Sequence, residues 1–405
     1  MDHVKLPILI VGGGQAGART LRALVDAGVT SPVILVGDEP HAPYDRPPLS
    51  KDLLRDFNIA KADSLCPPDV LSAPHVELVL NDPAVAIDYG KKIATTGSGR
   101  TIVFGVLVLA TGGRSRSLMC PGAEHCISLR SLEDCRVLSQ AFATAKRIVV
   151  IGGGVIGLEV AGAARERGID VIVLEAGPRL MARILPPTAS IWLAERHRAY
   201  GVDIRTGLNV HAVVQNEAGY VVQTDQGEVM GDFVLSAVGM TPNTELAPPD
   251  TIGPAGGIAT DAAGRVVGHD NVYAAGDVAE SFSPHFGNHV RLETWRNADR
   301  QPQIIARTIL GANAEHSEVP WMWTDQLGHN LQVVGRWTET SEEVARGEIG
   351  TKGSSLFWTQ NGVLAGGVLF DNGRDRRFLE ALVEKKTAVP KESLANPKTR
   401  LKDFA

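Results

Sequence analysis

Short apolar runs that end in glycine-rich turns recur along the chain. Residues 7–11 are continuously apolar, as expected of a buried parallel strand. A glycine-rich turn follows, and then a helical stretch over residues 18–26 with Gly28 as the predicted C′ residue. A second apolar strand, residues 32–36, comes next. The pattern predicts a strand–turn–helix–strand unit.

The turn of this unit has the spacing G-x-G-x-x-G. Its glycines are Gly12, Gly14 and Gly17, with Ala16 before the last. The first glycine permits a tight turn, the second lets the backbone approach a pyrophosphate, and the third lets the helix pack on the strand. Asp38 follows the second strand and would accept hydrogen bonds from an adenosine ribose. The unit therefore predicts a dinucleotide site at a helix N-terminus.

The same design recurs in the middle of the chain. Its parts are a strand over residues 147–151, the loop glycines Gly152, Gly154 and Gly157, a helix over 158–167, a strand over 170–174 and the closing acid Glu175. One such fingerprint is a weak signal, but two complete copies strongly indicate two dinucleotide sites. Glu175 would repel a 2′-phosphate and favours NADH over NADPH, although Arg179 and Arg183 nearby weaken that preference.

Two further strands decide which loop binds which cofactor. One apolar strand ends in Thr111-Gly112, and another ends in Gly276-Asp277. In flavoproteins that bind two dinucleotides, the second motif brings its aspartate to the ribityl and phosphate end of FAD. The sequence therefore predicts FAD at the first loop and NADH at the second.

Turn-rich segments divide the chain into three predicted domains. They are an FAD-binding domain over residues 1–115 and 246–318, an NADH-binding domain over 116–245, and a C-terminal α+β domain over 319–405. The last domain shows short strands and one helix but no redox motif, and is expected to be a dimer interface, a cover for the flavin, or both. The predicted fold class is α/β, with two Rossmann-like dinucleotide-binding domains and the C-terminal α+β domain.

Composition and charge exclude some other classes of protein. The 405 residues are 44% hydrophobic and 21% charged, and the net charge is −6. This balance is typical of a globular protein and argues against nucleic-acid binding. No apolar run approaches the roughly 20 residues of a spanning helix, and residues 1–5 do not read as a signal-peptide leader. We therefore expect a soluble cytoplasmic protein.

The cysteines bear on the reaction. Cys66, Cys120, Cys126 and Cys135 show neither C-x-x-C spacing nor a zinc quartet with histidine, so no metal site is expected. Disulfide reductases of related design place a reactive cysteine near the flavin, soon after the first unit. The corresponding stretch, residues 43–51, contains none. This favours a reductase of an electron carrier over a disulfide reductase.

Several segments resemble a known family. They are the two glycine loops, D-R-P-P-L-S-K at residues 45–51, E-T-W at 293–295 and P-W-M-W-T-D-Q at 320–326. Together they are similar to the glutathione-reductase-type ferredoxin reductases. These are FAD-containing, NADH-dependent reductases of multicomponent aromatic-ring dioxygenases and of some haem monooxygenase systems. The similarity covers essentially the whole chain.

The resemblance implies roles for individual residues. Lys51 would lie beside the flavin near N5 and pair with Glu159, for which an ordinary salt bridge is the alternative. Trp295 and either Trp321 or Trp323 would contact the isoalloxazine ring, unless they only pack in the core. The other positions assigned to cofactor binding are Ala16, Ala84, Arg130, Gly239 and Glu293, the last just before a helix expected over residues 295–310. The positive end of that helix would face the flavin.

The resemblance also implies the reaction and its partner. Hydride would pass from NADH to FAD, and electrons would then pass singly to a [2Fe–2S] ferredoxin, with a Rieske-type ferredoxin of a dioxygenase favoured. A plant-type ferredoxin of a haem monooxygenase and rubredoxin are the alternatives, and the protein would be a monomer or homodimer. A basic patch is expected for docking, either Arg374, Arg376 and Arg377 or Lys51 with Arg46 and Arg291. A redox-sensing NADH-binding interaction protein is the alternative from another class.

Overall fold

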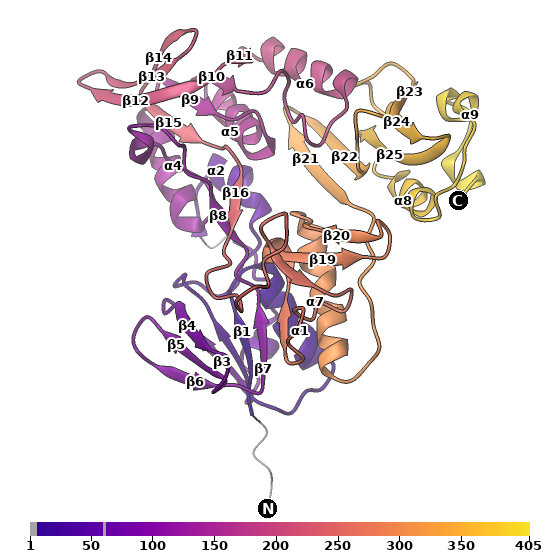
Figure 1. The fold of residues 1–405 in the computed structure, drawn as a ribbon. Helices are drawn as coiled ribbons and strands as arrows, with labels where there is room; N and C mark the ends of the chain where they lie inside the picture. The colour runs from indigo at the N-terminus through magenta and orange to yellow at the C-terminus, as the bar shows by residue number, and fades with distance from the viewer. Residues whose placement is uncertain (1–5, 60–61) are drawn as a thin grey trace, which may run out of the picture. The chain divides into compact units, whose positions relative to one another are not determined.

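The computed structural model describes residues 6–59 and 62–405, so the expectation about residues 1–5 lies outside it. The chain forms two compact units, each built from separate stretches of sequence and drawn in Figure 1. The first unit comprises residues up to 46, residues 62–114 and residues 241–318; the second comprises residues 47–61, 115–240 and 319–405. The middle and C-terminal stretches share one unit, and the division into three domains stays a prediction.

A five-stranded parallel sheet forms the centre of the first unit. Its order is β18-β7-β1-β2-β3. The strands are β1 (Ile8–Val11), β2 (Val33–Val36), β3 (Val76–Val79), β7 (Val106–Leu109) and β18 (Val272–Ala274). Every residue of β1, β2 and β18 is buried, which explains their continuously apolar sequences. The carboxyl ends of β1, β7 and β18 meet at one edge, where the predicted FAD-binding motifs follow them.

Helices and small sheets cover both faces of this sheet. Helices α1 (Gln15–Asp26) and α7 (Trp295–Ile309) join one core cluster through Leu21, Leu24 and Ile305. An antiparallel sheet packs Ala94 and Ile102 against the opposite face. Its strands are β4 (Ala84–Asp88), β5 (Ile93–Thr96) and β6 (Thr101–Val103). The other elements of the unit are α3 (Pro68–Leu71), β17 (Ile258–Thr260), β19 (Ala279–Ser283) and β20 (Asn288–Val290).

The second unit contains a sheet of the same design. Four parallel strands in the order β11-β10-β9-β15 form it. They are β9 (Arg147–Ile151), β10 (Asp170–Glu175), β11 (Val202–Thr206) and β15 (Phe233–Ser236). An antiparallel sheet again accompanies it, with β12 (Val210–Asn216), β13 (Gly219–Thr224) and β14 (Gly227–Gly231). The helices are α2 (Asp52–Arg55), α4 (Leu132–Thr144), α5 (Val155–Glu166) and α6 (Pro187–Ala199). Strand β8 (Gly113–Ser115) pairs with β16 (Met240–Pro242), and in both strands the chain passes from one unit to the other.

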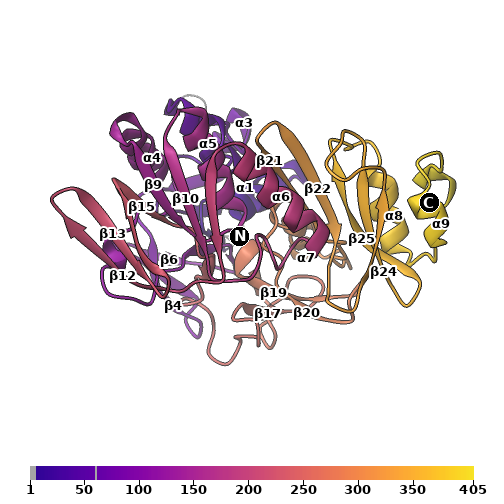
Figure 2. The same cartoon turned by 90° about the horizontal axis from the view of Figure 1, so that it is seen from above.

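The C-terminal stretch adds a five-stranded antiparallel sheet to the second unit. Its order is β21-β22-β25-β24-β23. The strands are β21 (Trp321–Gln326), β22 (His329–Gly335), β23 (Glu342–Arg346), β24 (Ser355–Gln360) and β25 (Val363–Phe370). Helix α8 (Arg376–Glu384) lies against β22 and β25, as Figure 2 shows, and α9 (Lys391–Ala395) follows. Leu379 and Leu382 of α8 join the core cluster of this sheet. The predicted fold class is confirmed.

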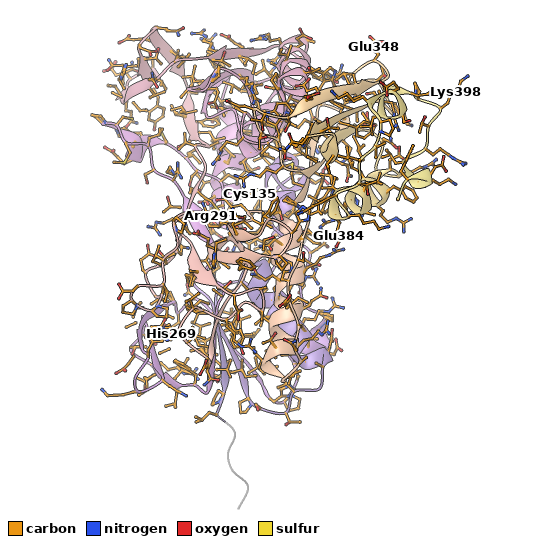
Figure 3. The ribbon with its side chains drawn as sticks, turned by 45° about the vertical axis from the view of Figure 1, so that its right-hand side comes forward. Cys135, His269, Arg291, Glu348, Glu384 and Lys398 are labelled. Carbon is orange, nitrogen blue, oxygen red and sulfur yellow. The ribbon has the colours of Figure 1, made fainter. Side chains whose placement is uncertain are left out.

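The cysteines of the described residues are all free. Cys66 is buried, its thiol donates to the carbonyl of Ala18, and burial raises its pKa to about 11. Cys135, labelled on α4 in Figure 3, is also buried, with its pKa raised to about 11. These groups stay protonated at neutral pH and make poor nucleophiles.

No helix within residues 6–59 and 62–405 is long and apolar enough to cross a membrane.

A buried histidine makes the stability of the first unit depend on pH. Nε2 of His316 lies 2.9 Å from Oδ1 of Asn297 and 3.7 Å from Oε2 of Glu318. Burial, with smaller contributions from the charges of Arg300 and Arg296, lowers the pKa of His316 from 6.5 to about 4. Between these values the unfolded chain binds a proton that the folded protein does not, so the free energy of unfolding falls as the pH falls.

We therefore expect His316 to reduce the free energy of unfolding by about 2 kcal/mol when the pH is lowered from 7 to 5. Urea titrations at the two pH values measure this effect. The variant His316→Gln keeps a donor for Asn297 but cannot titrate, so its stability should depend less on pH. Equal pH dependence in the variant and the natural protein would contradict the assignment.

Candidate functional site

The first glycine loop joins β1 to α1, and two of its glycines are required by the backbone. Gly12 has a φ of +121°, and a Cβ there would lie 2.1 Å from the carbonyl oxygen of Ala110. A Cβ at Gly17 would lie 1.9 Å from the carbonyl oxygen of Gly12. Gly14 differs, because the nearest atom to a Cβ there is 3.8 Å away, on Arg46. The loop is closed on the sheet side and open at its second glycine.

This opening fits a dinucleotide pyrophosphate. No side chain caps α1 at Gly14, and the first turn contains no acidic residue, so its N–H groups face an anion site. The side-chain amide of Gln15 is buried and has no hydrogen-bond partner among the described residues. A bound polar group at this position would satisfy it.

The end of β7 is tied to a distant segment of the first unit. The hydroxyl of Thr111 donates to the carbonyl of Asn243 at 2.6 Å, and the amide side chain of Asn243 donates back to the Thr111 carbonyl at 3.0 Å. The Asn243 N–H also donates to the carbonyl of Gly112. Thr111 and Gly112 thus lie at the sheet edge with fixed backbones.

The Gly-Asp turn after β18 abuts the first loop. A Cβ at Gly276 would lie 2.8 Å from the Cβ of Ala16, and the Gly276 N–H donates to Gln301 on α7. Asp277 follows and is half-buried. The structure therefore brings Ala16, Gly276 and Asp277 together at one edge of the sheet.

Two acids follow β2, and they differ in how they are held. The carboxylate of Glu39 accepts from Arg46 at 2.6 Å and from the hydroxyl of Tyr44. Asp38 is exposed. Asp38 is thus better placed than Glu39 to receive a ribose.

Ala84 belongs to a segment that lies beside the end of β2, the strand that Asp38 follows. The N–H groups of Asn81 and Asp82 donate to the carbonyls of Glu39 and Gly37. These bonds bring the chain just before β4 beside the end of β2. Ala84, the first residue of β4, is half-buried there.

The start of α7 carries two predicted residues. The indole N–H of Trp295 donates to Asp45 at 2.8 Å. Glu293 forms an ion pair with Arg291, which is labelled in Figure 3. Thr294 caps the helix by accepting from the Asn297 N–H. Trp295 is therefore oriented by a carboxylate at the helix N-terminus, and the charge of Glu293 is neutralised.

The second glycine loop repeats the geometry of the first. Gly152 has a φ of +111°, and a Cβ there would lie 2.4 Å from the carbonyl oxygen of Ala237. A Cβ at Gly157 would lie 2.2 Å from the carbonyl oxygen of Gly152. A Cβ at Gly154 would meet nothing within 4 Å. No side chain caps α5 at Gly154, so this loop also fits a pyrophosphate.

The acid at the end of β10 is held by the backbone. The carboxylate of Glu175 accepts from the N–H groups of Gly153 and Gly177, both at 2.6 Å. A carboxylate fixed beside the loop would hydrogen-bond a ribose 2′-hydroxyl and repel a 2′-phosphate.

Arg179 and Arg183, the two arginines near Glu175 in sequence, contact the protein backbone or lie near Gly239. Both terminal nitrogens of Arg179 donate to backbone carbonyls, those of Ala182 and Leu185. A terminal nitrogen of Arg183 lies 3.6 Å from where a Cβ of Gly239 would be, at the left-handed residue after β15. These two bonds hold the guanidinium of Arg179 on the backbone of residues 182–185.

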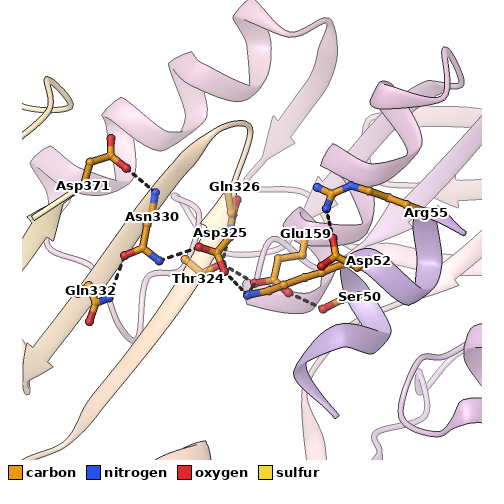
Figure 4. A network of polar contacts seen from close by, with 11 residues as sticks. Ser50, Asp52, Arg55, Glu159, Thr324, Asp325, Gln326, Asn330, Gln332 and Asp371 are labelled. Atoms are coloured by element: carbon orange, nitrogen blue, oxygen red, sulfur yellow. Dashed lines mark hydrogen bonds and ion pairs between the residues drawn. The ribbon is translucent and has the colours of Figure 1, made fainter. Parts of the chain in front are cut away.

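A charged network surrounds Glu159 on α5 (Figure 4). Its side chain is 4% exposed. It accepts hydrogen bonds from the hydroxyls of Ser50 and Thr324, the latter at 2.6 Å. Nζ of Lys51 lies 3.6 Å from Oε1 of Glu159 and 2.6 Å from Oδ2 of Asp325. The structure brings Lys51 and Glu159 together, as the resemblance implied.

The pKa values of the two carboxylates beside Lys51 are shifted in opposite directions. Burial raises the pKa of Glu159, although the charge of Lys51 and the two hydroxyl bonds oppose it. Burial also acts to raise the pKa of Asp325, but the hydrogen bonds from Lys51 and Asn330 bring it below its usual value. A raised pKa on a buried acid beside a cation is typical of functional sites.

Two tryptophans of β21 lie beside this network. The rings of Trp321 and Trp323 stack with centroids 5.2 Å apart. Lys51 lies 5.5 Å above the Trp323 ring, and Arg376 lies 4.6 Å from the Trp321 ring centroid. Both indoles are half-buried, so the choice between them stays open.

The predicted residues thus fall into two groups. The first unit holds Gly12, Gly14, Ala16, Gly17, Asp38, Ala84, Thr111, Gly112, Asp277, Glu293 and Trp295. The second holds Lys51, Arg130, Gly152, Gly154, Gly157, Glu159, Glu175, Gly239 and Trp321. Arg130 lies just before α4, where its N–H donates to Asp134 at 2.8 Å.

Three residues of the network received no role from the sequence. Ser50, Thr324 and Asp325 contact Lys51 or Glu159 directly. All three belong to segments that carried the family resemblance, which was the signal that could have identified them. Their function depends on contacts over more than 100 residues of sequence, which no local pattern contains.

Comparisons with known proteins identify the family. Residues 6–301 match the family described as pyridine nucleotide-disulphide oxidoreductase, and residues 321–405 match a reductase C-terminal family. The chain is 33% identical to the ferredoxin–NAD(+) reductase component of the anthranilate 1,2-dioxygenase system of Burkholderia cepacia, over 98% of this chain and 99% of that protein.

Solved structures agree. The ferredoxin reductase for the CYP199A2 system of Rhodopseudomonas palustris matches with a TM-score of 0.93 and 32% identity, covering 98% of this chain and 100% of that one. The reductase in a covalent putidaredoxin reductase–putidaredoxin complex matches with a TM-score of 0.92 and 28% identity, covering 99% and 98%. The chain therefore belongs to the pyridine nucleotide-disulphide oxidoreductase family and is an FAD- and NADH-dependent oxidoreductase of the ferredoxin–NAD(+) reductase group.

Proposed function

We propose that this protein passes electrons from NADH at the second loop, through FAD at the first, to a [2Fe–2S] ferredoxin. The pair of loops carries the proposal, because each is closed against the sheet at its first and third motif glycines and has free space at the second. FAD, when bound, takes up a hydride and releases electrons one at a time. The absence of cysteine from residues 43–51 supports a one-electron carrier as acceptor over a disulfide.

The residues of the first unit are proposed to hold FAD. The N–H groups at the start of α1 would bind its pyrophosphate, and Asp38 its adenosine ribose. Asp277 would receive the ribityl end, beside Thr111 and Gly112. Trp295, held by Asp45, would pack against the flavin and help to exclude water.

The residues of the second unit are proposed to hold NADH. Gly154 would admit the pyrophosphate, and Glu175 would bind the adenosine ribose. Glu159, with its carboxylate buried among hydroxyls and Lys51, would orient the nicotinamide. No proton has to move to or from a side chain for hydride transfer, so these groups act by placing charge.

The ferredoxin is proposed to be of the Rieske type, in an aromatic-ring dioxygenase system. Similarity to a dioxygenase reductase component over almost the full length of both chains supports this choice. A plant-type ferredoxin of a haem monooxygenase and rubredoxin are the alternatives. Arg374 and Arg377 are exposed and would favour an acidic partner. A cytoplasmic location and a monomeric or homodimeric state remain predictions.

The partner is tested by NADH-dependent reduction of cytochrome c in the presence of each ferredoxin. We expect a Rieske-type ferredoxin to stimulate turnover at least about tenfold more than the other carriers, because specific docking raises productive encounters. Glu159→Gln keeps the size of the side chain and should slow the reduction of the flavin by NADH. The decrease should be the same with every carrier, because this step precedes electron transfer to the carrier. Failure of every ferredoxin to stimulate turnover would contradict the proposal.

We also expect a strong preference for NADH over NADPH. The fixed carboxylate of Glu175 disfavours a 2′-phosphate, and the terminal nitrogens of Arg179 are already bound by backbone carbonyls. The ratio of kcat/KM values for the two nucleotides should therefore be about 100 or more. Glu175→Gln should lower this ratio by improving use of NADPH.

Arg179 provides the comparison. Because its guanidinium supports the backbone of residues 182–185, Arg179→Met should lower stability without lowering kcat/KM for NADPH relative to NADH. Steady-state kinetics with both nucleotides measures this. A selective loss of NADPH use in Arg179→Met would show that Arg179 reaches the 2′-phosphate after all.

A further inference from the structure

The turn between β21 and β22 places the side chain of Leu327 against α5. Its two residues, Leu327 and Gly328, have φ values of +51° and +81°. A leucine in this region is strained, yet Leu327 is 4% exposed. A Cβ at Gly162 of α5 would lie 3.3 Å from it, so only a small residue there admits the leucine. The strained turn therefore has a packing partner on the helix that carries Glu159.

Each residue before this turn is bonded to a different segment. Thr324 donates to Glu159, and Gln326 lies 2.7 Å from Nε2 of His197 on α6. Asp325, between them, accepts from Lys51 at 2.6 Å (Figure 4). The C-terminal sheet thus contributes side chains directly to the Lys51–Glu159 network.

Asp325 is itself held in place. The side-chain amide of Asn330 donates to its Oδ1 at 2.7 Å, which leaves Oδ2 directed at Lys51. The N–H of Asn330 donates to Asp371 at 2.7 Å, and Asp371 lies 2.9 Å from Nδ1 of His329. The chain of contacts runs from Lys51 into the C-terminal sheet without a break.

The distances show which acid holds the lysine. Lys51 is 1 Å closer to Asp325 than to Glu159, at 2.6 Å against 3.6 Å. Glu159 already accepts from two hydroxyls and does not need the ammonium for hydrogen bonding. A lysine side chain is a flexible four-carbon stem with a point charge at its end. Asp325 is the residue that accepts a hydrogen bond from this ammonium among the described residues, so its loss would free the ammonium from its place beside Glu159.

We propose that Asp325 is a positioning residue, which fixes the ammonium of Lys51 beside Glu159 and makes the C-terminal domain part of the NADH site. The proposal rests on the proposed function, in which Lys51 and Glu159 act on the nicotinamide. It gives the C-terminal domain a role besides those of a dimer interface or a flavin cover.

Four variants of the FAD-loaded protein test this role. Asp325→Asn removes the charge, Asn330→Ala removes only the group that orients it, and Asp325→Glu restores a carboxylate. Asp52→Asn is the matched control, because Asp52 neighbours Lys51 in sequence but pairs with Arg55, at 2.8 Å, and is 87% exposed. The first readout is the rate at which acetic anhydride labels Lys51, followed by mass spectrometry without NADH present. The second is anaerobic stopped-flow reduction of the flavin, analysed for its limiting rate and apparent Kd for NADH.

We expect Asp325→Asn to label Lys51 at least roughly fivefold faster and to lower the limiting rate by a similar factor, since a charge-assisted hydrogen bond is lost. Asn330→Ala should lie between this variant and the natural protein, and Asp325→Glu should recover most of the rate. Asp52→Asn should match the natural protein in both readouts. Unchanged labelling in Asp325→Asn, or an equal change in Asp52→Asn, would overturn the proposal.

Adding Glu159→Gln to the same measurements distinguishes the positioning role of Asp325 from the proposed role of Lys51 and Glu159. If Asp325→Asn exposes Lys51 to labelling but Glu159→Gln leaves flavin reduction unchanged, Asp325 positions the lysine and the proposed role of the pair is wrong. If Glu159→Gln slows reduction and labelling in Asp325→Asn is unchanged, the role of the pair stands and the positioning role of Asp325 is wrong.

Discussion

Replacing Gly154 by alanine is expected to weaken NADH binding by about 10- to 100-fold while FAD stays bound. Its φ is −84°, which alanine adopts freely, and its Cβ would meet no protein atom within 4 Å. The added methyl group would instead occupy the space above the first N–H groups of α5. Loss of one charge-assisted hydrogen bond to the pyrophosphate costs about 1.5–3 kcal/mol, which corresponds to this range.

Gly14→Ala is the mirror experiment in the first loop. Its φ is −81°, and the nearest protein atom to a Cβ is 3.8 Å away. This variant should lose FAD on dilution or dialysis while apo-protein still folds. Isothermal titration of each variant with each cofactor measures both effects. Loss of the same cofactor in both variants would contradict the assignment of one loop to each.

Glycines at the other ends of the same helices are the controls. Gly28 and Gly168 follow α1 and α5 with φ values of +74° and +77°, and a Cβ at either would meet nothing within 4 Å. Alanine at these positions should cost about 1 kcal/mol through backbone strain without changing either cofactor affinity. The comparison separates a lost binding surface from a general loss of stability.

Replacing Lys51 by methionine is expected to destabilise the second unit, and more so at high pH. The variant would leave Glu159 buried without its cation, and breaking a buried pair typically costs about 3–5 kcal/mol. Burial already raises the pKa of Glu159, and loss of Lys51 would raise it further. The folded protein then keeps the proton to higher pH than the unfolded chain does, so the free energy of unfolding falls as the pH rises above the usual carboxyl range.

Urea titrations of Lys51→Met at pH 5.5 and pH 8 measure this effect. We expect the deficit relative to the natural protein to be larger at pH 8. Adding Glu159→Gln to Lys51→Met removes the buried charge. The amide keeps an acceptor oxygen for one of the two hydroxyls and offers an N–H that the other hydroxyl can accept, so the pH-dependent part of the deficit should disappear. An equal deficit at both pH values would show that Lys51 contributes packing and not charge.

The sequence predicted those elements of the fold that a local pattern of apolar residues and glycines determines. The strand over residues 147–151 was predicted with its observed bounds, because the four buried residues after the exposed Arg147 lie inside a parallel sheet and leave an unbroken apolar run. Helix α5 begins at Val155, earlier than the predicted start at residue 158. The helix starts inside the glycine motif, whose residues resemble a loop when read alone.

Elements stabilised mainly by tertiary contacts were missed. Helix α4 was not predicted, although Ser131 and Asp134 form a capping box at its start that the sequence displays. Strand β23 was not predicted either, since its ladder with β24 supplies the pairing that its polar sequence does not suggest. Helix α6 was not predicted either; it begins at Pro187, a residue that suits the first turn of a helix, with Pro186 at the N-cap.

The site was predictable where a motif carries the chemistry. The glycine spacing predicts both pyrophosphate positions, because each glycine meets a separate backbone requirement. The contacts of Glu159 were not predictable in this way. Ser50 and Thr324 are 109 and 165 residues away in sequence, and only the fold brings their hydroxyls to one carboxylate.

The central claim, that NADH reduces bound FAD and a ferredoxin then takes the electrons singly, is tested most directly by anaerobic double-mixing stopped flow. The FAD-loaded protein is mixed with one equivalent of NADH and then with oxidised Rieske-type ferredoxin. We predict complete flavin reduction in the first step. In the second, two ferredoxins should be reduced for each NADH consumed, since NADH supplies two electrons and each cluster accepts one. Flavin that NADH reduces but that no ferredoxin reoxidises would contradict the account.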